Sequence, residues 1–234
     1  MTDFASPTDW AAEIYRRLLA AYGVPDWRPH YRPVEELVMT ILSQNTSDLN
    51  SGRAFESLQA RYPTWEAVLA APVDELAETI RSGGLSQQKA PRIQSALRRI
   101  LVERGDFNLD FLADLPRDEA LAWLTSFNGI GPKTASIVLL FCFGMPAFPV
   151  DTHITRVSQR LGIAGPKDSP TQIQAIWESL TPAEWYYPLH LNLIRHGRTI
   201  CRPKPRCGEC GLRRMCPWYR RERAASGHSP GARR

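Results

Sequence analysis

The stretch FNGIGPKTASIVLLF, residues 127–141, decides the fold. Gly129 and Gly131 stand one residue apart, which permits a tight turn in which the backbone comes close to another molecule. Lys133 then opens an apolar run that predicts a buried helix, and the free N–H groups at the start of a helix are suited to a phosphate. The stretch therefore predicts a hairpin between two helices. A plain tight turn with no ligand is the alternative.

The remainder of the chain is predicted to be helical as well. Ser6, Ser169 and Thr181 each precede a proline, which marks a helix start, and Thr181 with Glu184 has the pattern of a capping box. Further helical patterns lie at residues 10–22, 33–43, 49–62, 64–71, 73–82, 87–105, 117–127 and 173–180. The alternation of period two that is typical of strands is absent from the sequence. We predict an all-α fold of about ten helices joined by short turns.

The composition is that of an ordinary globular protein. The chain has 234 residues, enough for one domain or two small ones, and 43% of them are hydrophobic. No apolar run approaches the roughly 20 residues that span a bilayer, and the N-terminus lacks the layout of a signal peptide. We expect no membrane association and a cytoplasmic location, next to the nucleoid in a bacterium. Cysteines in that setting are expected to be metal ligands or buried thiols.

The positive charge is concentrated near the C-terminus. Residues 201–234 carry ten Lys and Arg against two Glu, whereas residues 1–200 have a balance of −3. A local excess of this size indicates nucleic acid as a partner. A solvated basic tail that only aids solubility is the alternative for the last residues.

Lys133 has the setting of a reactive amine. Desolvation by the apolar run and the positive end of the helix dipole are both expected to disfavour its charge, and a partly neutral amine is a nucleophile. Such an amine is able to attack the anomeric carbon of a nucleotide, expel the base and form a Schiff base with the opened sugar. The alternative is a lysine that only binds phosphate.

A second candidate lies in FPVDTHITRVSQRLG, residues 148–162, where Asp151 stands directly before a helix. The simplest interpretation is an N-cap whose carboxylate accepts a backbone N–H. A carboxylate paired with Lys133 would also stabilise an oxocarbenium-like sugar and help to deprotonate the amine or a water. The two roles are compatible.

Four cysteines form the pattern C-x5-C-x2-C-x5-C within 16 residues: Cys201, Cys207, Cys210 and Cys216. Spacing this close predicts a metal site, and both zinc and an iron–sulfur cluster accept four thiolates. Basic residues alternate with them, namely Arg202, Lys204, Arg206, Arg213 and Arg214. The fifth cysteine, Cys142, is predicted to be a small core residue.

These motifs together resemble the endonuclease III family of DNA glycosylases. NGIGPKTA, residues 128–135, looks like the family's helix-hairpin-helix, and VDTHITRV, residues 150–157, is similar to the segment with its catalytic aspartate. LIRHGRTIC, residues 193–201, followed by three more cysteines, resembles the [4Fe-4S] loop. The likeness runs in the right order from Pro33 to Cys216.

The resemblance implies roles for individual residues. Lys133 becomes the Schiff-base nucleophile, Asp151 the essential carboxylate, and the four cysteines the ligands of a [4Fe-4S] cluster, with zinc as the alternative that spacing leaves open. ILSQNTSD, residues 41–48, is similar to the stretch that fills the gap left by an extruded base, and GGLSQQKA, residues 83–90, to the loop that wedges into the duplex. The expected DNA contacts are Gln44, Asn45, Leu85, Gly129, Gly131, Thr134, Arg202, Lys204 and Arg206.

The resemblance also implies a two-lobed fold with the active site in the cleft between the lobes. Residues 29–145 would form a six-helix barrel with the hairpin. Residues 1–28 and 146–220 would form the lobe with the cluster, and residues 221–234 a disordered basic tail. We expect a monomer that binds double-stranded DNA with a damaged base or an abasic site.

Several positions depart from the family pattern. Asn128 stands where proline is usual, Asn45 where glutamine is common, and the first cysteine gap is one residue shorter. The segment before the hairpin, residues 105–123, is longer. These changes affect DNA contacts and damage preference and leave the lysine and the aspartate in place.

We therefore predict a bifunctional DNA glycosylase and abasic-site lyase that removes oxidised pyrimidines and cleaves 3′ to the lesion by β-elimination. Two alternatives stay open. One is a monofunctional adenine or mismatch thymine/uracil glycosylase of the same superfamily, although Thr40 stands where adenine glycosylases have a glutamate. The other is a non-enzymatic iron–sulfur or zinc module that binds DNA.

Overall fold

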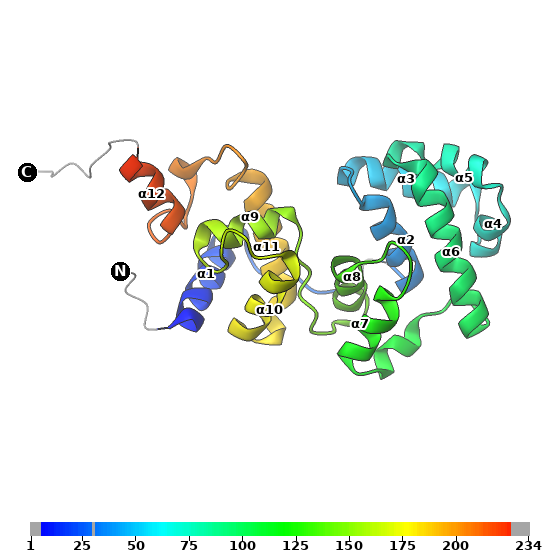
Figure 1. Cartoon of the computed structure of the whole chain (residues 1–234), viewed down its shortest axis with the longest axis horizontal. Coiled ribbons are helices and arrows are strands. Elements are labelled where there is room, and N and C mark those ends of the chain that lie inside the picture. The colour runs from blue at the N-terminus through cyan, green and yellow to red at the C-terminus, as the bar shows by residue number, and fades with distance from the viewer. Residues whose placement is uncertain (1–5, 30, 226–234) are drawn as a thin grey trace, which may run out of the picture. The chain divides into compact units, whose positions relative to one another are not determined.

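The structure, a computed structural model, describes residues 6–29 and 31–225. Every regular element in this part of the chain is a helix. They form twelve α-helices and four short 3-10 helices, and this part of the chain contains no strand. The all-α prediction is confirmed. The chain divides into two compact units: unit 1 comprises residues 1–27 and 146–234, and unit 2 comprises residues 28–145. Figure 1 labels their helices.

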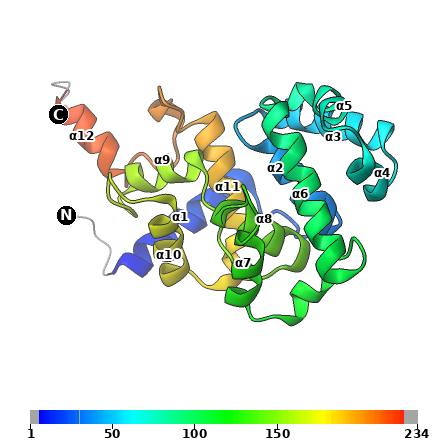
Figure 2. The same ribbon diagram turned by 45° about the vertical axis from the view of Figure 1, so that its right-hand side comes forward.

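Unit 2 holds the hairpin quoted above. Its α-helices are α2 (Pro33–Ser43), α3 (Asp48–Arg61), α4 (Trp65–Ala70), α5 (Val73–Thr79), α6 (Ser86–Arg104), α7 (Arg117–Thr125) and α8 (Pro132–Phe143). Two 3-10 helices, η1 (Arg81–Gly83) and η2 (Asp110–Asp114), connect them. Helix α2 packs against α3, α6 and α8, and Figure 2 shows α2 and α6 side by side.

The core of unit 2 is built from the apolar faces of these helices. Leu37 of α2, Leu97 of α6 and Leu139 of α8 are fully buried. On α6 the buried residues recur every three or four positions, which is the spacing of one helix face. Helix α8, by contrast, is buried on most of its surface, as its apolar run predicts.

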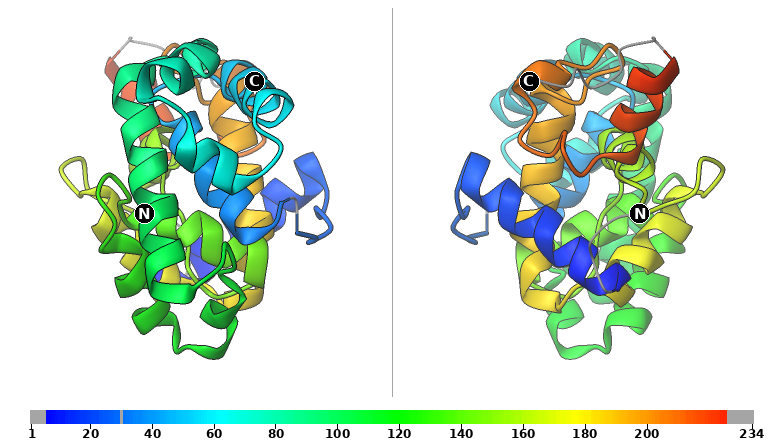
Figure 3. Two further views of the ribbon diagram at one scale, coloured as in Figure 1. Left: turned by 90° about the vertical axis from the view of Figure 1, so that its right-hand side faces the viewer. Right: turned by 90° about the vertical axis from the view of Figure 1, so that its left-hand side faces the viewer.

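Unit 1 combines the first helix with the C-terminal part of the chain. Its elements are α1 (Pro7–Tyr22), α9 (Thr152–Leu161), α10 (Pro170–Leu180), η3 (Ala183–Trp185), α11 (Tyr186–Thr199), η4 (Cys207–Glu209) and α12 (Pro217–Ala225). Helix α11 packs against α1 and α9 (Figure 3). The packing with α9 is close, because a Cβ on Gly197 would lie 2.8 Å from the Cβ of His153.

The helix starts follow the predicted capping chemistry with one exception. Ser6 accepts a hydrogen bond from the Asp9 N–H, and Ser169 forms a full capping box with Gln172. The capping box predicted at Thr181 is wrong. The Thr181 hydroxyl instead donates to the carbonyl of Trp177 at 2.7 Å, and only the short η3 follows. The hydroxyl completes the end of α10 and so is not available to cap a new helix.

The C-terminal segment is more regular than expected. Helix α12 continues to Ala225, so residues 221–225 are helical where a disordered tail is predicted. Residues 226–234 of that tail lie outside the described residues. Among the described residues, no helix combines the length and the apolar character that crossing a membrane would require.

Candidate functional site

The hairpin before α8 takes the turn that its two glycines permit. Gly129 has φ +80°, in the left-handed region that favours glycine, and a Cβ there would lie 3.0 Å from Cδ of Arg92. The side-chain amide of Gln44 donates to the Gly129 carbonyl at 3.0 Å and lies 3.5 Å from the Thr134 hydroxyl. The structure thus brings together three of the predicted DNA contacts, one from the end of α2 and two from the hairpin.

Lys133 lies in the first turn of α8 and is exposed. The expectation that the apolar run desolvates it is wrong, because Pro132 and Lys133 are exposed and the buried part of α8 begins only at Thr134. Gly131 is the N-cap and has no side chain to occupy the first N–H groups of α8. A Cβ on Gly131 would meet no atom within 4 Å. The start of α8 is therefore open to a ligand beside an accessible amine.

Asp151 is half-buried at the start of α9 in unit 1. Its carboxylate accepts the N–H of Ile154 at 2.7 Å, so the predicted N-cap is confirmed. The Thr155 hydroxyl donates to the Asp151 carbonyl at 2.8 Å, which fixes the first turn from the other side. One carboxylate oxygen has the backbone as its partner, and the residue is still partly accessible to solvent.

Two further predicted contacts share an unusual backbone conformation. Asn45 has φ +54° and Leu85 has φ +49°, and they are the only non-glycine residues with positive φ in the described part of the chain. Both are exposed, and 49% of the Leu85 surface is accessible. The left-handed region is unfavourable for a residue with a Cβ, so neighbouring structure must hold these two loops.

The four cysteines gather in unit 1, where they line one cavity together with His196. Burial raises the pKa of Cys210 to about 11 and also raises the pKa of Cys216. A metal bound to these sulfurs would favour their thiolate forms. Within the described residues, no three His, Cys, Asp or Glu side chains converge tightly enough for a single metal ion.

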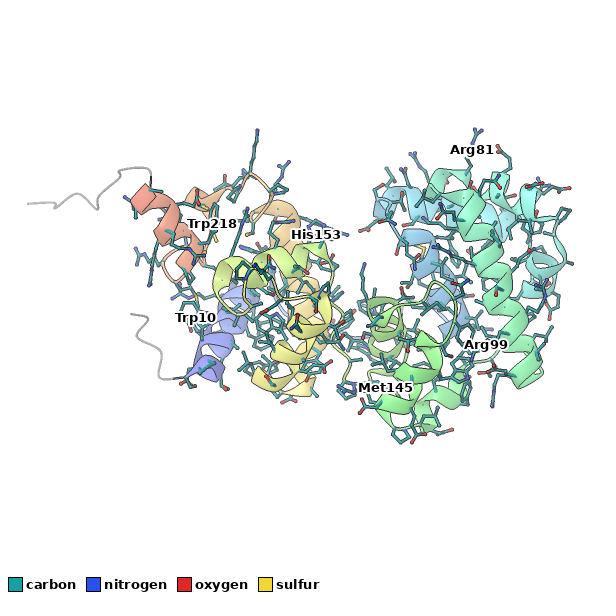
Figure 4. The ribbon with its side chains drawn as sticks, in the orientation of Figure 1. Trp10, Arg81, Arg99, Met145, His153 and Trp218 are labelled. Atoms are coloured by element: carbon teal, nitrogen blue, oxygen red, sulfur yellow. The ribbon has the colours of Figure 1, made fainter. Side chains whose placement is uncertain are left out.

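Two arginines of α9 hold the cysteine loop, and the sequence prediction missed both. Arg156 donates to the carbonyls of Cys201 at 2.8 Å and Gly197 at 2.9 Å. Arg160 donates to the carbonyls of Arg202 and Pro203, and its guanidinium lies 4.5 Å from the ring centroid of Trp218. Figure 4 labels Trp218 on α12 and His153 on α9. The spacing of four residues between Arg156 and Arg160, on the helix that Asp151 caps, is the signal that was available.

The basic residues of the cysteine loop lie on its surface. Arg202, Lys204 and Arg206 are all exposed, as a phosphate contact requires. Arg206 also pairs with Glu209 at 2.8 Å, which partly offsets its charge. Cys142 is half-buried at the end of α8 rather than in the core, and its thiol lies 3.8 Å from the Tyr31 carbonyl.

Comparison with known proteins places this arrangement in a family. Residues 38–183 match the model of the HhH-GPD superfamily of base excision DNA repair proteins, and the chain belongs to that superfamily. It is 37% identical to Endonuclease III of Bacillus subtilis over 188 residues, which cover 80% of this chain and 82% of the relative. It is 35% identical to Endonuclease III of Synechocystis over 216 residues, which cover 91% and 94%.

A solved structure of a trapped Endonuclease III–DNA covalent intermediate matches the fold. Its TM-score is 0.80 at 28% identity, and the match covers 92% of this chain and 98% of that one. Within the superfamily, this chain is therefore a member of the endonuclease III family of DNA glycosylases.

Proposed function

We propose that the chain is a bifunctional enzyme that removes oxidised pyrimidines from double-stranded DNA and cleaves the strand through a Schiff base at Lys133. The observation that carries this proposal is the accessible amine of Lys133 beside the open start of α8. An exposed amine at this position would be accessible to a DNA backbone, and the first N–H groups of α8 suit a phosphate. The matching structure of a trapped Endonuclease III–DNA covalent intermediate supports the same chemistry.

In the proposed reaction, the Lys133 nitrogen attacks C1′ of the damaged nucleotide, the glycosidic bond breaks, and the base leaves with the bonding electrons and a proton. The C1′–O4′ bond then breaks, O4′ takes a proton, and an imine joins Lys133 to the open sugar. Loss of a proton from C2′ breaks the bond between C3′ and its phosphate, which is β-elimination. Water finally hydrolyses the imine and frees the amine.

Asp151 supplies the negative charge for these steps. Its carboxylate stabilises the positive charge that develops on the sugar and accepts a proton from the attacking amine. The hydrogen bond from the Ile154 N–H fixes the orientation of the carboxyl group. The capping role and the catalytic role are thus served by one side chain.

Asn45 and Leu85 are proposed to act on the duplex rather than on the sugar. Leu85 is an exposed apolar side chain on a short loop, which suits a wedge between base pairs, and Asn45 would fill the gap after the base leaves the stack. Gln44, Gly129, Gly131 and Thr134 would position the backbone near Lys133, while Arg202, Lys204 and Arg206 would bind phosphates from unit 1.

We propose that Cys201, Cys207, Cys210 and Cys216 hold a [4Fe-4S] cluster. A single zinc ion brings its four sulfurs to within roughly 3.8 Å of one another, whereas the cubane cluster binds each cysteine at a separate iron. Four cysteines that line one cavity supply the four thiolate ligands that the cluster needs. A cluster held by these residues would supply structure, because Cys201 follows α11 and Cys216 directly precedes α12. Four irons and four acid-labile sulfides per purified chain are expected, and one zinc would contradict the assignment.

The test of the activity is borohydride trapping on a duplex with one abasic site. The chain contains four lysines, namely Lys89, Lys133, Lys167 and Lys204, so the adduct is readily assigned. Wild type and Lys167→Gln are expected to form a covalent adduct, and Lys133→Gln to form none. Lys167 is a matched control because it is exposed and also follows Gly-Pro. Undiminished trapping by Lys133→Gln would overturn the proposal, and binding without an adduct in wild type would favour a monofunctional glycosylase.

A further inference from the structure

Lys89 is a buried lysine that the proposed chemistry does not use. Only 1% of its surface is exposed, and it lies in the first turn of α6. Its ammonium group donates to the carbonyl of Leu42 at 2.7 Å and to the carbonyl of Gly83 at 2.7 Å. Burial of a lysine is unfavourable unless its donors are satisfied, so these two bonds determine where the side chain lies.

The first carbonyl belongs to the last turn of α2. The final carbonyls of a helix lack N–H partners within the helix, and they form the negative end of its dipole. An ammonium group on the Leu42 carbonyl offsets both effects. Three residues later the chain reaches Asn45, at φ +54°, after Gln44 has bonded to the hairpin. Lys89 therefore fixes the point at which the Asn45 loop leaves its helix.

The second carbonyl belongs to η1, which begins at Arg81, labelled in Figure 4. Gly83 is closely packed there, because a Cβ would lie 3.1 Å from Cβ of Ala54 and 3.7 Å from the Leu42 carbonyl oxygen. Two residues later the chain reaches Leu85, at φ +49°. One ammonium group therefore binds directly upstream of both residues with unusual backbone angles.

We propose that Lys89 is a positioning residue that holds the Asn45 and Leu85 loops in a single arrangement for extrusion of the damaged base. The inference rests on the proposed function, because it assigns those two loops to the duplex. Each loop is under backbone strain that the surrounding structure must offset. Because the Lys89 ammonium group is bonded to the chain just before both loops, it keeps Leu85 and Asn45 at a fixed separation. Small displacements of such groups lower rates by large factors.

The effect is expected on extrusion and not on the Schiff base. A stacked, paired base resists extrusion, whereas an abasic nucleotide has no base to unstack. Loss of Lys89 should therefore slow removal of a base and spare trapping at a preformed abasic site. A general loss of stability would lower both activities together, so the ratio of the two separates positioning from mere structural support.

The experiment compares Lys89→Met with Gln94→Met. Gln94 is a matched control on the same helix, because it is 5% exposed and its amide donates to the carbonyls of Val68 at 2.9 Å and Ala71 at 2.7 Å, away from both loops. Each protein is given a duplex with one thymine glycol and 2-aminopurine in the opposite strand, whose fluorescence reports unstacking. Borohydride trapping on an abasic duplex is measured in parallel at a temperature where circular dichroism shows all proteins folded.

Lys89→Met is expected to remove thymine glycol at a rate lower by roughly tenfold or more, which is the effect of a small displacement of a contacting group. The fluorescence change should be lost. Trapping on the abasic duplex should stay within about threefold of wild type. Gln94→Met is expected to match wild type in all three. Equal rate losses in both variants would overturn the inference. A fluorescence change in Lys89→Met as large as that of wild type would also overturn it. Absence of trapping in wild type would instead contradict the proposed function. If Lys89→Met does not fold, Lys89→Gln, which keeps a donor, takes its place.

Discussion

Two helix starts in unit 2, those of α6 and α8, each carry a lysine in the first turn, and the two side chains have opposite surroundings. Lys89 of α6 is buried and bonded to two carbonyls, whereas Lys133 of α8 is exposed beside an uncapped helix start. Burial, and after it the charge of Arg92, lowers the pKa of Lys89 from its ordinary value. The difference teaches that an apolar run after a lysine does not by itself bury the lysine. Whether a lysine is buried depends on the helix face that carries it.

For Lys89, the helix face can be inferred from the spacing of the buried residues of α6. Lys89 lies four residues before Ile93 and eight before Leu97, both fully buried, so it continues the inner stripe of α6. Helix α8 is buried from Thr134 onward, and only its first two residues, Pro132 and Lys133, are exposed. One lysine is therefore suited to support and the other to contact with DNA.

The largest expected effect tests the exposed lysine. Lys133→Gln removes the proposed nucleophile, so strand cleavage at an abasic site should fall by roughly a thousandfold or more. Gel analysis of a labelled duplex under single-turnover conditions measures it, with Lys167→Gln as the control. Cleavage by Lys133→Gln at the wild-type rate would assign the chemistry to another group.

The second test measures the free energy of unfolding instead of the activity. Lys89→Met leaves two buried carbonyls without donors and should lower the free energy of unfolding by about 2 to 4 kcal/mol. Lys133→Gln alters an exposed side chain and should change it by less than about 0.5 kcal/mol. Urea denaturation followed by circular dichroism measures both. Equal stability of the two variants would show that the contrast between the lysines has no energetic basis.

The third test asks what burial does to an ionisable group with weaker partners than those of Lys89. Glu36 of α2 is 7% exposed, and burial raises its pKa from 4.5 to about 7, against the opposing effect of a hydrogen bond from Thr40. A raised pKa in the folded state means that the folded chain holds a proton that the unfolded chain has released. Stability should therefore fall as the pH rises from about 4.5 to about 7.

Glu36→Gln removes that dependence. Relative to wild type, the variant should gain about 2 kcal/mol of unfolding free energy between pH 5 and pH 8. Urea denaturation at the two pH values measures the gain. If the stability of the variant and that of the wild type changed with pH in parallel, burial would not have raised the pKa of Glu36 in the folded protein.

The test with the smallest expected effect separates the capping role of Asp151 from its proposed catalytic role. Unlike the two lysines, Asp151 caps the helix that it precedes. Asparagine caps as well as aspartate, so Asp151→Asn should keep the wild-type stability, whereas Asp151→Ala should lose about 1 kcal/mol. Asp151→Asn should nevertheless slow base removal and leave binding to abasic DNA largely intact. Thermal unfolding and a single-turnover assay together decide it, since normal turnover in Asp151→Asn would leave the carboxylate with a capping role alone.

The sequence by itself determined the helical class, the hairpin, the cap at Asp151 and the family, because each follows from residues close together in the chain. Helix periodicity, a Gly-x-Gly turn, a capping carboxylate and cysteine spacing are all local patterns, and local chemistry suffices to interpret them. The side chains proposed for catalysis and for the cluster were likewise identified from these patterns, and their roles stay predictions.

Only the tertiary structure decided which lysine is buried, why Asn45 and Leu85 hold positive φ, and how Arg156 and Arg160 secure the cysteine loop. The physical reason is that each depends on backbone carbonyls contributed by distant segments. A carbonyl is present in every residue and leaves no mark in the sequence. The sequence shows which donors a chain possesses, and only the packing of its helices shows which acceptors they reach.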